Sequence, residues 1–180
     1  MTDDEAGLVE RSLGGDLDAF ETLIRRYQRM VYSLAYRMTG SAADAEDLTQ
    51  ETFIRAHTQL AAFRGNAGFS SWLYRIAVNQ CLDWLKRAER RQRLDERWKL
   101  QRRDMQPAED ALAERIQEAL LQLSPKQRAA IALTVYQGLS HAEAAQALGC
   151  SETTISWRLF TARSKLKRLL QDLGRGRFGV

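Results

Sequence analysis

With 180 residues and a net charge of +4, the chain can form one domain or two small ones, which excludes a large multidomain enzyme. Its 44% hydrophobic residues are enough for real cores, and a mean hydropathy of −0.44 excludes a protein immersed in lipid. Because it has only two prolines and eleven glycines, and sheets need frequent turn residues, the composition favours an all-α fold.

The cysteines and the N-terminus bear on the cellular compartment. Cys81 and Cys150 are the only cysteines and have no CxxC partner, which argues against a disulfide framework or a zinc module and fits a reducing cytoplasm. The N-terminal MTDDEAGLVE is acidic where a signal peptide is basic, and no run of about 18 apolar residues occurs. We therefore expect a cytoplasmic protein with no membrane insertion.

Charge is strongly segregated along the chain. Residues 1–21 contain seven acidic residues and one basic residue. Residues 84–103 contain nine basic and three acidic residues, and residues 152–180 contain seven basic and two acidic ones. Two separated basic segments predict contact with a polyanion at two places, although solvated Arg-rich helices would give the same pattern.

The first half of the chain reads as three helices. Apolar residues from Leu17 to Met38 alternate spacings of three and four, which predicts a helix that Gly40 ends. Ser41, with an aspartate three residues later, has the form of a capping box and predicts a second helix to about Leu60. The glycines and asparagine of residues 63–69 predict a loop.

Ser70 is the predicted cap of a third helix, which runs through about Leu85 and frays into the basic segment. From residue 93 to residue 106 the apolar periodicity is lost, which predicts a linker between two helical domains. The second domain then begins at Pro107.

Capping signals divide the second domain into helices. Ser124, followed by proline and with a glutamine three residues on, predicts a helix start, and that helix is expected to continue to Gly138. Ser140 predicts the start of the next helix, and Ser151 the start of the last long one.

The last two helices have the pattern of a helix-turn-helix. Ala145, Gly149 and Ile155 supply the small residue, the turn residue and the core residue at the expected offsets. The second helix is expected to place early residues against base edges and later cations against phosphates; a hairpin packed inside the protein is disfavoured by its many Arg and Lys residues. The residues expected to point outward are Thr153, Thr154, Ser156, Trp157, Arg158, Thr161, Arg163 and Lys165.

Four segments follow the order and spacing of one known family: DAEDLTQETFIRAH (44–57), FRGNAGFSSWLYRIAVNQCLDWLKR (63–87), LSPKQRAAIAL (123–133) and the helix-turn-helix. Together they resemble a bacterial sigma factor of the extracytoplasmic function (ECF) type, which keeps only the second and fourth conserved regions. The resemblance covers about residues 8–172. It implies a region 2 domain (1–92), a linker (93–106), a region 4 domain (107–173) and a basic tail (174–180).

The resemblance implies that the second helix docks on the basic coiled coil of the largest polymerase subunit. Its acidic residues recur at helical spacing, so carboxylates would meet Arg or Lys there. Taken alone, the same face reads as a solvated helix surface. The residues placed at this contact are Asp44, Asp47, Gln50, Glu51 and Phe53.

The loop and the third helix resemble the part that recognises and opens the −10 promoter element. Opening needs a loop that captures an unstacked base, amides that read base edges and cations for phosphate. Trp72 and Trp84 lie on the apolar stripe and are expected in the core, whereas Phe63 is left open between packing and base contact. The implied site comprises Phe63, Arg64, Gly65, Asn66, Ala67, Gly68, Tyr74, Arg75, Asn79, Lys86 and Arg87.

The recognition helix is expected to read the −35 element. Many relatives carry basic residues at the positions of Ser156 and Thr161, so direct guanine contacts by these two are not expected and the preferred sequence differs. Phe160 is left open between a DNA contact and an inward position. The implied reading residues are Ser156, Trp157, Arg158, Phe160 and Thr161.

No catalytic constellation accompanies these motifs. His57 and His141 are isolated, and neither HExxH nor GxxxxGK[ST] occurs. We expect a non-catalytic initiation subunit, without cofactor or metal, that binds RNA polymerase core, promoter DNA and an anti-sigma factor. The alternatives are a stand-alone helix-turn-helix regulator, which leaves the acidic helix and the loop unexplained, and a nucleic-acid-processing enzyme.

Overall fold

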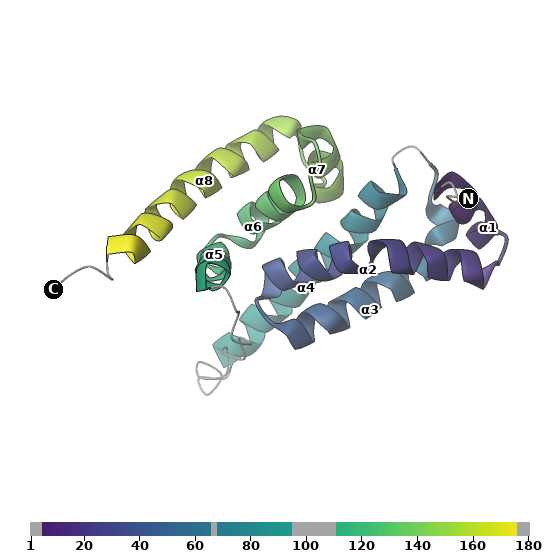
Figure 1. Cartoon of the computed structure of the whole chain (residues 1–180), viewed down its shortest axis with the longest axis horizontal. Coiled ribbons are helices and arrows are strands. Elements are labelled where there is room, and N and C mark those ends of the chain that lie inside the picture. The colour runs from purple at the N-terminus through teal and green to yellow at the C-terminus, as the bar shows by residue number, and fades with distance from the viewer. Residues whose placement is uncertain (1–4, 66–67, 95–110, 176–180) are drawn as a thin grey trace.

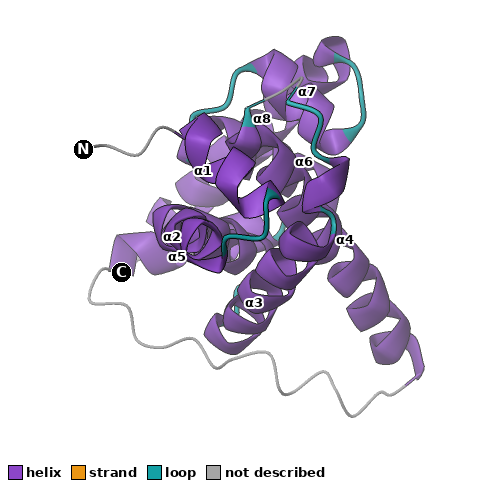
Figure 2. Cartoon of the chain, turned by 90° about the vertical axis from the view of Figure 1, so that its right-hand side faces the viewer, coloured by secondary structure: helices purple, strands orange, loops and turns teal. Residues whose placement is uncertain are grey.

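The computed structural model describes residues 5–65, 68–94 and 111–175. Within these ranges the chain consists of helices and their connections, with no strand (Figure 2). The expected all-α class is therefore confirmed. The first residues of the predicted linker (93–106) belong to the last turn of a helix that ends at Leu94. Residues 95–106 of the linker and residues 176–180 of the predicted tail lie outside the described ranges.

The first domain is a bundle in which α2, α3 and α4 pack together and α1 packs on α2 (Figure 1). The short α1 escaped prediction, although its Leu8 and Val9 are buried in the core. Its elements are α1 (Glu5–Leu13), α2 (Leu17–Thr39), α3 (Ala42–Thr58), the short 3-10 helix η1 (Leu60–Ala62) and α4 (Phe69–Leu94).

Local capping chemistry defines the end of α2 and the start of α3 in this domain. Gly40 adopts a positive φ of 74° and its N–H donates to the Tyr36 carbonyl, which ends α2 as expected. Ser41 caps α3 through a hydrogen bond from the Asp44 N–H to its hydroxyl, 3.2 Å long. The prediction for Ser70 was wrong, because α4 begins at Phe69 and Ser70 lies inside its first turn.

The second domain contains two complete capping boxes, one at Ser124 and one at Ser140, as expected. The helix after Ser124 does not continue regularly to Gly138: a π-helical segment follows, in which the Gln137 N–H donates to the Ala132 carbonyl. Its elements are α5 (Ala111–Leu121), α6 (Pro125–Ile131), the π-helical η3 (Ala132–Tyr136), α7 (His141–Leu148) and α8 (Glu152–Arg175).

The two domains pack against each other. Helix α4 contacts α7, and α2 contacts α5, α6 and η3. Arg128 of α6 is 6% exposed, and its guanidinium donates to the carbonyl of Met38 at the end of α2 as well as to carbonyls of its own domain. Gln117 of α5 donates to the Tyr36 carbonyl at 3.1 Å, and the Arg37 guanidinium lies 3.4 Å from the centre of the Tyr136 ring. Buried polar contacts thus fix a closed arrangement of the domains.

Candidate functional site

Helix α3 presents an acidic face with an apolar residue in line. Asp47, Gln50 and Glu51 are exposed, and Ile54 is 65% exposed. Their spacing of three, one and three residues puts all four on one side of the helix. Sequence reasoning missed Ile54, although its helical register with Asp47 and Gln50 was readable. We call these four residues the α3 face.

Two residues expected at this contact lie elsewhere. Phe53 is 7% exposed and packs in the core with Leu48 and Ala56, so its ring faces away from solvent, and its contact with polymerase stays a prediction. The reason is helical register, because Phe53 lies 100° away from Ile54. Asp44 is half-buried in the first turn, near the capping serine.

The loop before α4 rests on an aromatic cluster. The Phe63 ring lies 5.8 Å from that of Phe69 and 5.3 Å from that of Trp72, centre to centre, and is half-buried. Phe63 therefore packs under the loop. Arg64, Gly65 and Gly68 are exposed, and Gly65 has a φ of 70°, a conformation that glycine adopts without strain. Asn66 and Ala67 lie outside the described residues.

A hollow of about 320 Å³ opens beside this loop. Phe63, Arg64 and Arg75 line it from the first domain, and Gln146 and Ala147 of α7 line it from the second. In the closed arrangement the helix-turn-helix therefore forms one wall of the space next to the loop.

Helix α4 presents polar side chains beyond the loop. The exposed residues are Arg75, Asn79, Lys86 and Arg87. Two of them contact Asp83: Lys86 Nζ lies 3.4 Å from its carboxylate, and Arg87 Nε donates to its backbone carbonyl. Trp72 and Trp84 are half-buried against the core, as expected.

Tyr74 does not lie on this exposed surface. It is 1% exposed, and its hydroxyl donates to Oε1 of Gln137 in the second domain, so the prediction that it lies off the buried side was wrong. Burial raises the pKa of Tyr74 to about 12, so the phenol remains a protonated donor to higher pH than an exposed tyrosine does.

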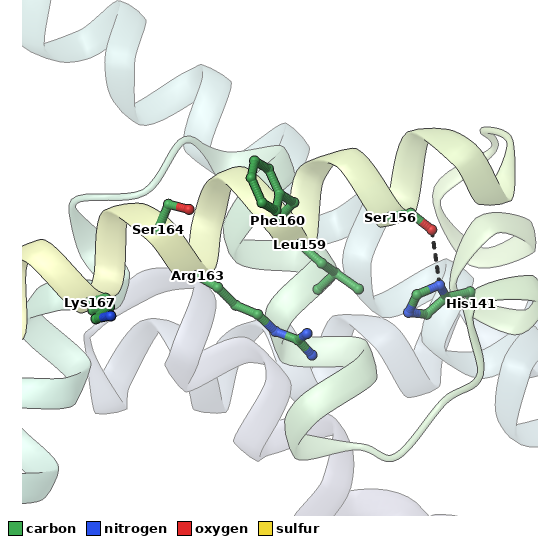
Figure 3. A pocket seen from close by; sticks show the side chains of 7 residues that line it. All are labelled: His141, Ser156, Leu159, Phe160, Arg163, Ser164 and Lys167. Carbon is green, nitrogen blue, oxygen red and sulfur yellow. Dashed lines mark hydrogen bonds between the residues drawn. The ribbon is translucent and has the colours of Figure 1, made fainter.

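Helix α8 has one continuous exposed face. Phe160 is 71% exposed and Trp157 is 63% exposed. Phe160, which the sequence left open between a DNA contact and an inward position, therefore points into solvent. Figure 3 shows Phe160 pointing away from the domain while Leu159 points into it, along a hollow of about 350 Å³. The exposed residues that share this face at helical spacing are Thr153, Ser156, Trp157, Phe160, Arg163, Ser164 and Lys167.

Other residues expected to reach DNA are held by the protein itself. Arg158 is half-buried and donates to Cys150 Sγ at 3.4 Å. Thr161 accepts from Gln127 Nε2 at 3.0 Å and donates to the Trp157 carbonyl. Thr154 is half-buried.

Lys165 is also half-buried, and its Nζ donates to the Gln122 carbonyl at 2.6 Å. The helical pattern alone predicted that Arg158, Thr161 and Lys165 point outward. It does not show their contacts, which come from the turn before α8 for Arg158 and from residues 34 and 43 positions earlier for Thr161 and Lys165.

Two kinds of feature are absent from the part of the chain that the structure describes. No group of three or more His, Cys, Asp and Glu side chains is arranged to hold a metal ion there. None of the helices described combines the length and apolar character needed to cross a bilayer.

Comparison with known proteins identifies both domains. Residues 23–91 match the family model of Sigma-70 region 2, and residues 113–166 match that of Sigma-70, region 4. The chain is 38% identical over 174 residues to the ECF RNA polymerase sigma factor SigM of Mycobacterium tuberculosis, covering 96% of this chain and 87% of that protein. It is 34% identical over 173 residues to the ECF RNA polymerase sigma factor SigW of Bacillus subtilis, covering 88% and 92%.

Solved structures agree in fold. CnrH in complex with the cytosolic domain of CnrY superposes with a TM-score of 0.73 at 29% identity, covering 92% of this chain and 96% of that one. The sigma factor RpoE in complex with the anti-sigma factor NepR from Bartonella quintana gives a TM-score of 0.75 at 26% identity, covering 84% and 96%. With both regions matched in order and a relative 38% identical over almost the whole chain, the protein belongs to the ECF family of RNA polymerase sigma factors.

Proposed function

We propose that three surfaces of this sigma factor divide the work of promoter initiation. The α3 face docks on polymerase core, the loop around Arg64 and Gly65 with Asn79 captures an unpaired −10 base, and the exposed face of α8 reads the −35 element. The observation that carries the proposal is that all three surfaces are exposed, while the elements that bear them pack on buried cores. The chain itself carries out no covalent chemistry.

Docking through the α3 face combines charge and apolar burial. Asp47 and Glu51 supply carboxylates for a basic partner surface, which favours association rate and specificity more than affinity. Ile54 supplies the apolar contact, and burying such a side chain contributes about 1.5–3 kcal/mol. Apolar anchors ringed by polar groups are typical of protein interfaces.

Base capture next to α4 explains the composition of the loop. The glycine at positive φ lets the backbone approach a nucleotide closely, and the Asn79 amide both donates to and accepts from a base edge. Arg75, Lys86 and Arg87 provide cations for the phosphates of the displaced strand. Preferential binding of the extruded base shifts the duplex toward opening.

The closed arrangement of the domains bears on regulation. Gln146 and Ala147 border the hollow beside the loop, so promoter binding requires the second domain to move away from the first. Among the proteins that share the fold, CnrH is found in complex with the cytosolic domain of CnrY, and RpoE in complex with the anti-sigma factor NepR. We propose that an anti-sigma factor binds this chain likewise, in the cytoplasm where polymerase acts.

Transcription in vitro tests the proposal. Purified core polymerase with a genomic promoter library should give specific starts only when this chain is added, and the starts should share two elements. A stand-alone regulator would instead bind closed duplex tightly without polymerase and leave core inactive at the same promoters. That second result would contradict the proposal.

A further inference from the structure

The exposed face of α8 carries two large aromatic side chains near its start. Trp157 and Phe160 are 63% and 71% exposed, although aromatic side chains of this size normally contribute to cores and interfaces. They lie three residues apart on the same face, so the helix rise separates them by roughly 4.5 Å. That spacing is close to the rise of about 3.4 Å between neighbouring base pairs.

The polar groups around these two rings are engaged within the domain. The Ser156 hydroxyl is hydrogen-bonded to His141 Nδ1 at 3.1 Å, as Figure 3 shows. Arg158 is held by Cys150, and Thr161 is held by Gln127. The first half of this face, around Trp157 and Phe160, therefore does not offer the bidentate guanidinium contact that commonly reads guanine.

Cations on the face begin later along the helix. Arg163 is one turn beyond Phe160, and Lys167 is a further turn on; both are exposed. Cations at this end of a recognition helix meet phosphates, which fix the position of the helix without reading sequence. The apolar rings thus occupy the reading positions, between a short polar start at Thr153 and a phosphate-binding end.

In the major groove, the apolar feature of a base pair is the C5-methyl group of thymine. We infer that Trp157 and Phe160 read the −35 element through thymine methyl groups at neighbouring positions. This inference rests on the proposed placement of α8 in the major groove. Serine and threonine stand at positions 156 and 161, so neither position carries a cation that would read guanine beside the rings.

Uracil tests this inference, because it pairs as thymine does and lacks only the methyl group. Holoenzyme made from this chain and core polymerase first selects −35 elements from a randomised promoter library. Each selected thymine is then replaced singly by deoxyuridine, and holoenzyme affinity is measured at fixed salt, since phosphate contacts depend on salt. We expect about a fourfold loss for each thymine that a ring contacts, the value of one buried methyl group.

Variants assign each effect to a ring. Trp157→Ala and Phe160→Ala should each abolish the thymine-to-uracil difference at one position and keep it at the other. Trp157→Phe keeps an aromatic group and should retain part of the difference. Glu118→Ala, at an exposed position on α5 and outside the α8 face, is the control and should leave both differences unchanged.

The other possible results would contradict the methyl contact, the DNA-binding role of the two rings, or the proposed function. A selected element without thymine, or uracil differences that persist in both alanine variants, overturns the methyl contact. If the alanine variants leave every DNA affinity unchanged and weaken a protein complex instead, the patch is a protein-docking surface. Failure of the proposed function is separate: a scrambled −35 element would then bind holoenzyme as well as the selected one.

Discussion

The hydroxyl of Tyr74 in α4 donates to Oε1 of Gln137, 2.9 Å away and 63 residues later in the chain. Gln137 in turn donates from Nε2 to the Met30 carbonyl of α2 at 3.3 Å. One glutamine of the second domain therefore bridges two helices of the first. Its position follows from the π-helical η3 immediately before it.

Removing this hydroxyl should weaken domain closure. In Tyr74→Phe, Oε1 of the half-buried Gln137 loses its donor, which should cost about 1 kcal/mol, the low end of the range for an unsatisfied acceptor. Small-angle scattering should report a larger radius of gyration as the open population rises. Tyr27→Phe is the control, because that phenol bonds to Glu5 within the first domain. Equal scattering from both variants would show that the Tyr74 contact does not hold the domains together.

Docking on polymerase should depend both on the carboxylates of the α3 face and on its apolar residue, Ile54. The reversal of Asp47 and Glu51 to Lys should place like charges together and abolish core retention in a pull-down. Ile54→Ala should weaken core binding by roughly 2 kcal/mol, about 30-fold, through lost apolar burial. Glu10→Lys changes an exposed carboxylate on α1 and should retain core normally. Unchanged retention for all variants would remove the α3 face from the interface.

Base capture should appear as a difference between templates. Asn79→Ala should impair transcription strongly from duplex promoters, because the captured base loses its amide partner. On templates with a pre-melted −10 bubble the cost of extrusion is already met, so the defect should be smaller. Permanganate reactivity of unpaired thymines measures opening independently of RNA yield. Equal defects on both templates would assign Asn79 to another step.

Local chemistry explains which parts of the fold were readable from sequence. The cap at Gly40 and the capping boxes at Ser124 and Ser140 depend on residues within a few positions, so they were predictable. Tyr74 was misplaced for the opposite reason. Periodicity along one helix shows a single apolar stripe, whereas α4 is also covered by α7, and that second contact exists only once the domains meet.

The same limit applies to the DNA-contacting helix. Its start and direction followed from the turn, but which side chains stay available depended on partners such as Cys150, Gln127 and Gln122. The helix-turn-helix was thus predictable as an element, while its reading surface required the packed domain.

Gly40 should be sensitive to substitution for two separable reasons. An added Cβ there would lie 2.6 Å from Leu121 Cδ1 of the second domain, and the residue has a φ of 74°. Gly138→Ala is the matched control, since Gly138 has a similar φ of 72° and open space around the added atom. Both should lose about 1–2 kcal/mol to left-handed strain, and Gly40→Ala should lose more. Urea unfolding measures this, and Leu121→Ala should recover the excess loss in the double variant.

Stability at alkaline pH should depend on Cys81. Burial raises the pKa of this thiol to about 12, whereas an unfolded thiol ionises near pH 8.5. Above pH 8.5 the unfolded state therefore binds fewer protons than the folded state, so stability falls as pH rises toward 12, by about 2 kcal/mol at pH 10.

Urea unfolding at pH 7.5 and pH 10 should show this fall in the natural protein and a smaller fall in Cys81→Ala. The half-buried Cys150 provides the control, and Cys150→Ala should keep the full fall. A disulfide reagent at pH 9 should label Cys81 only as fast as the chain unfolds, because its thiol is buried as well as protonated. Rapid labelling of Cys81 in the folded protein, or equal alkaline losses in the two alanine variants, would contradict this account of the core of the first domain.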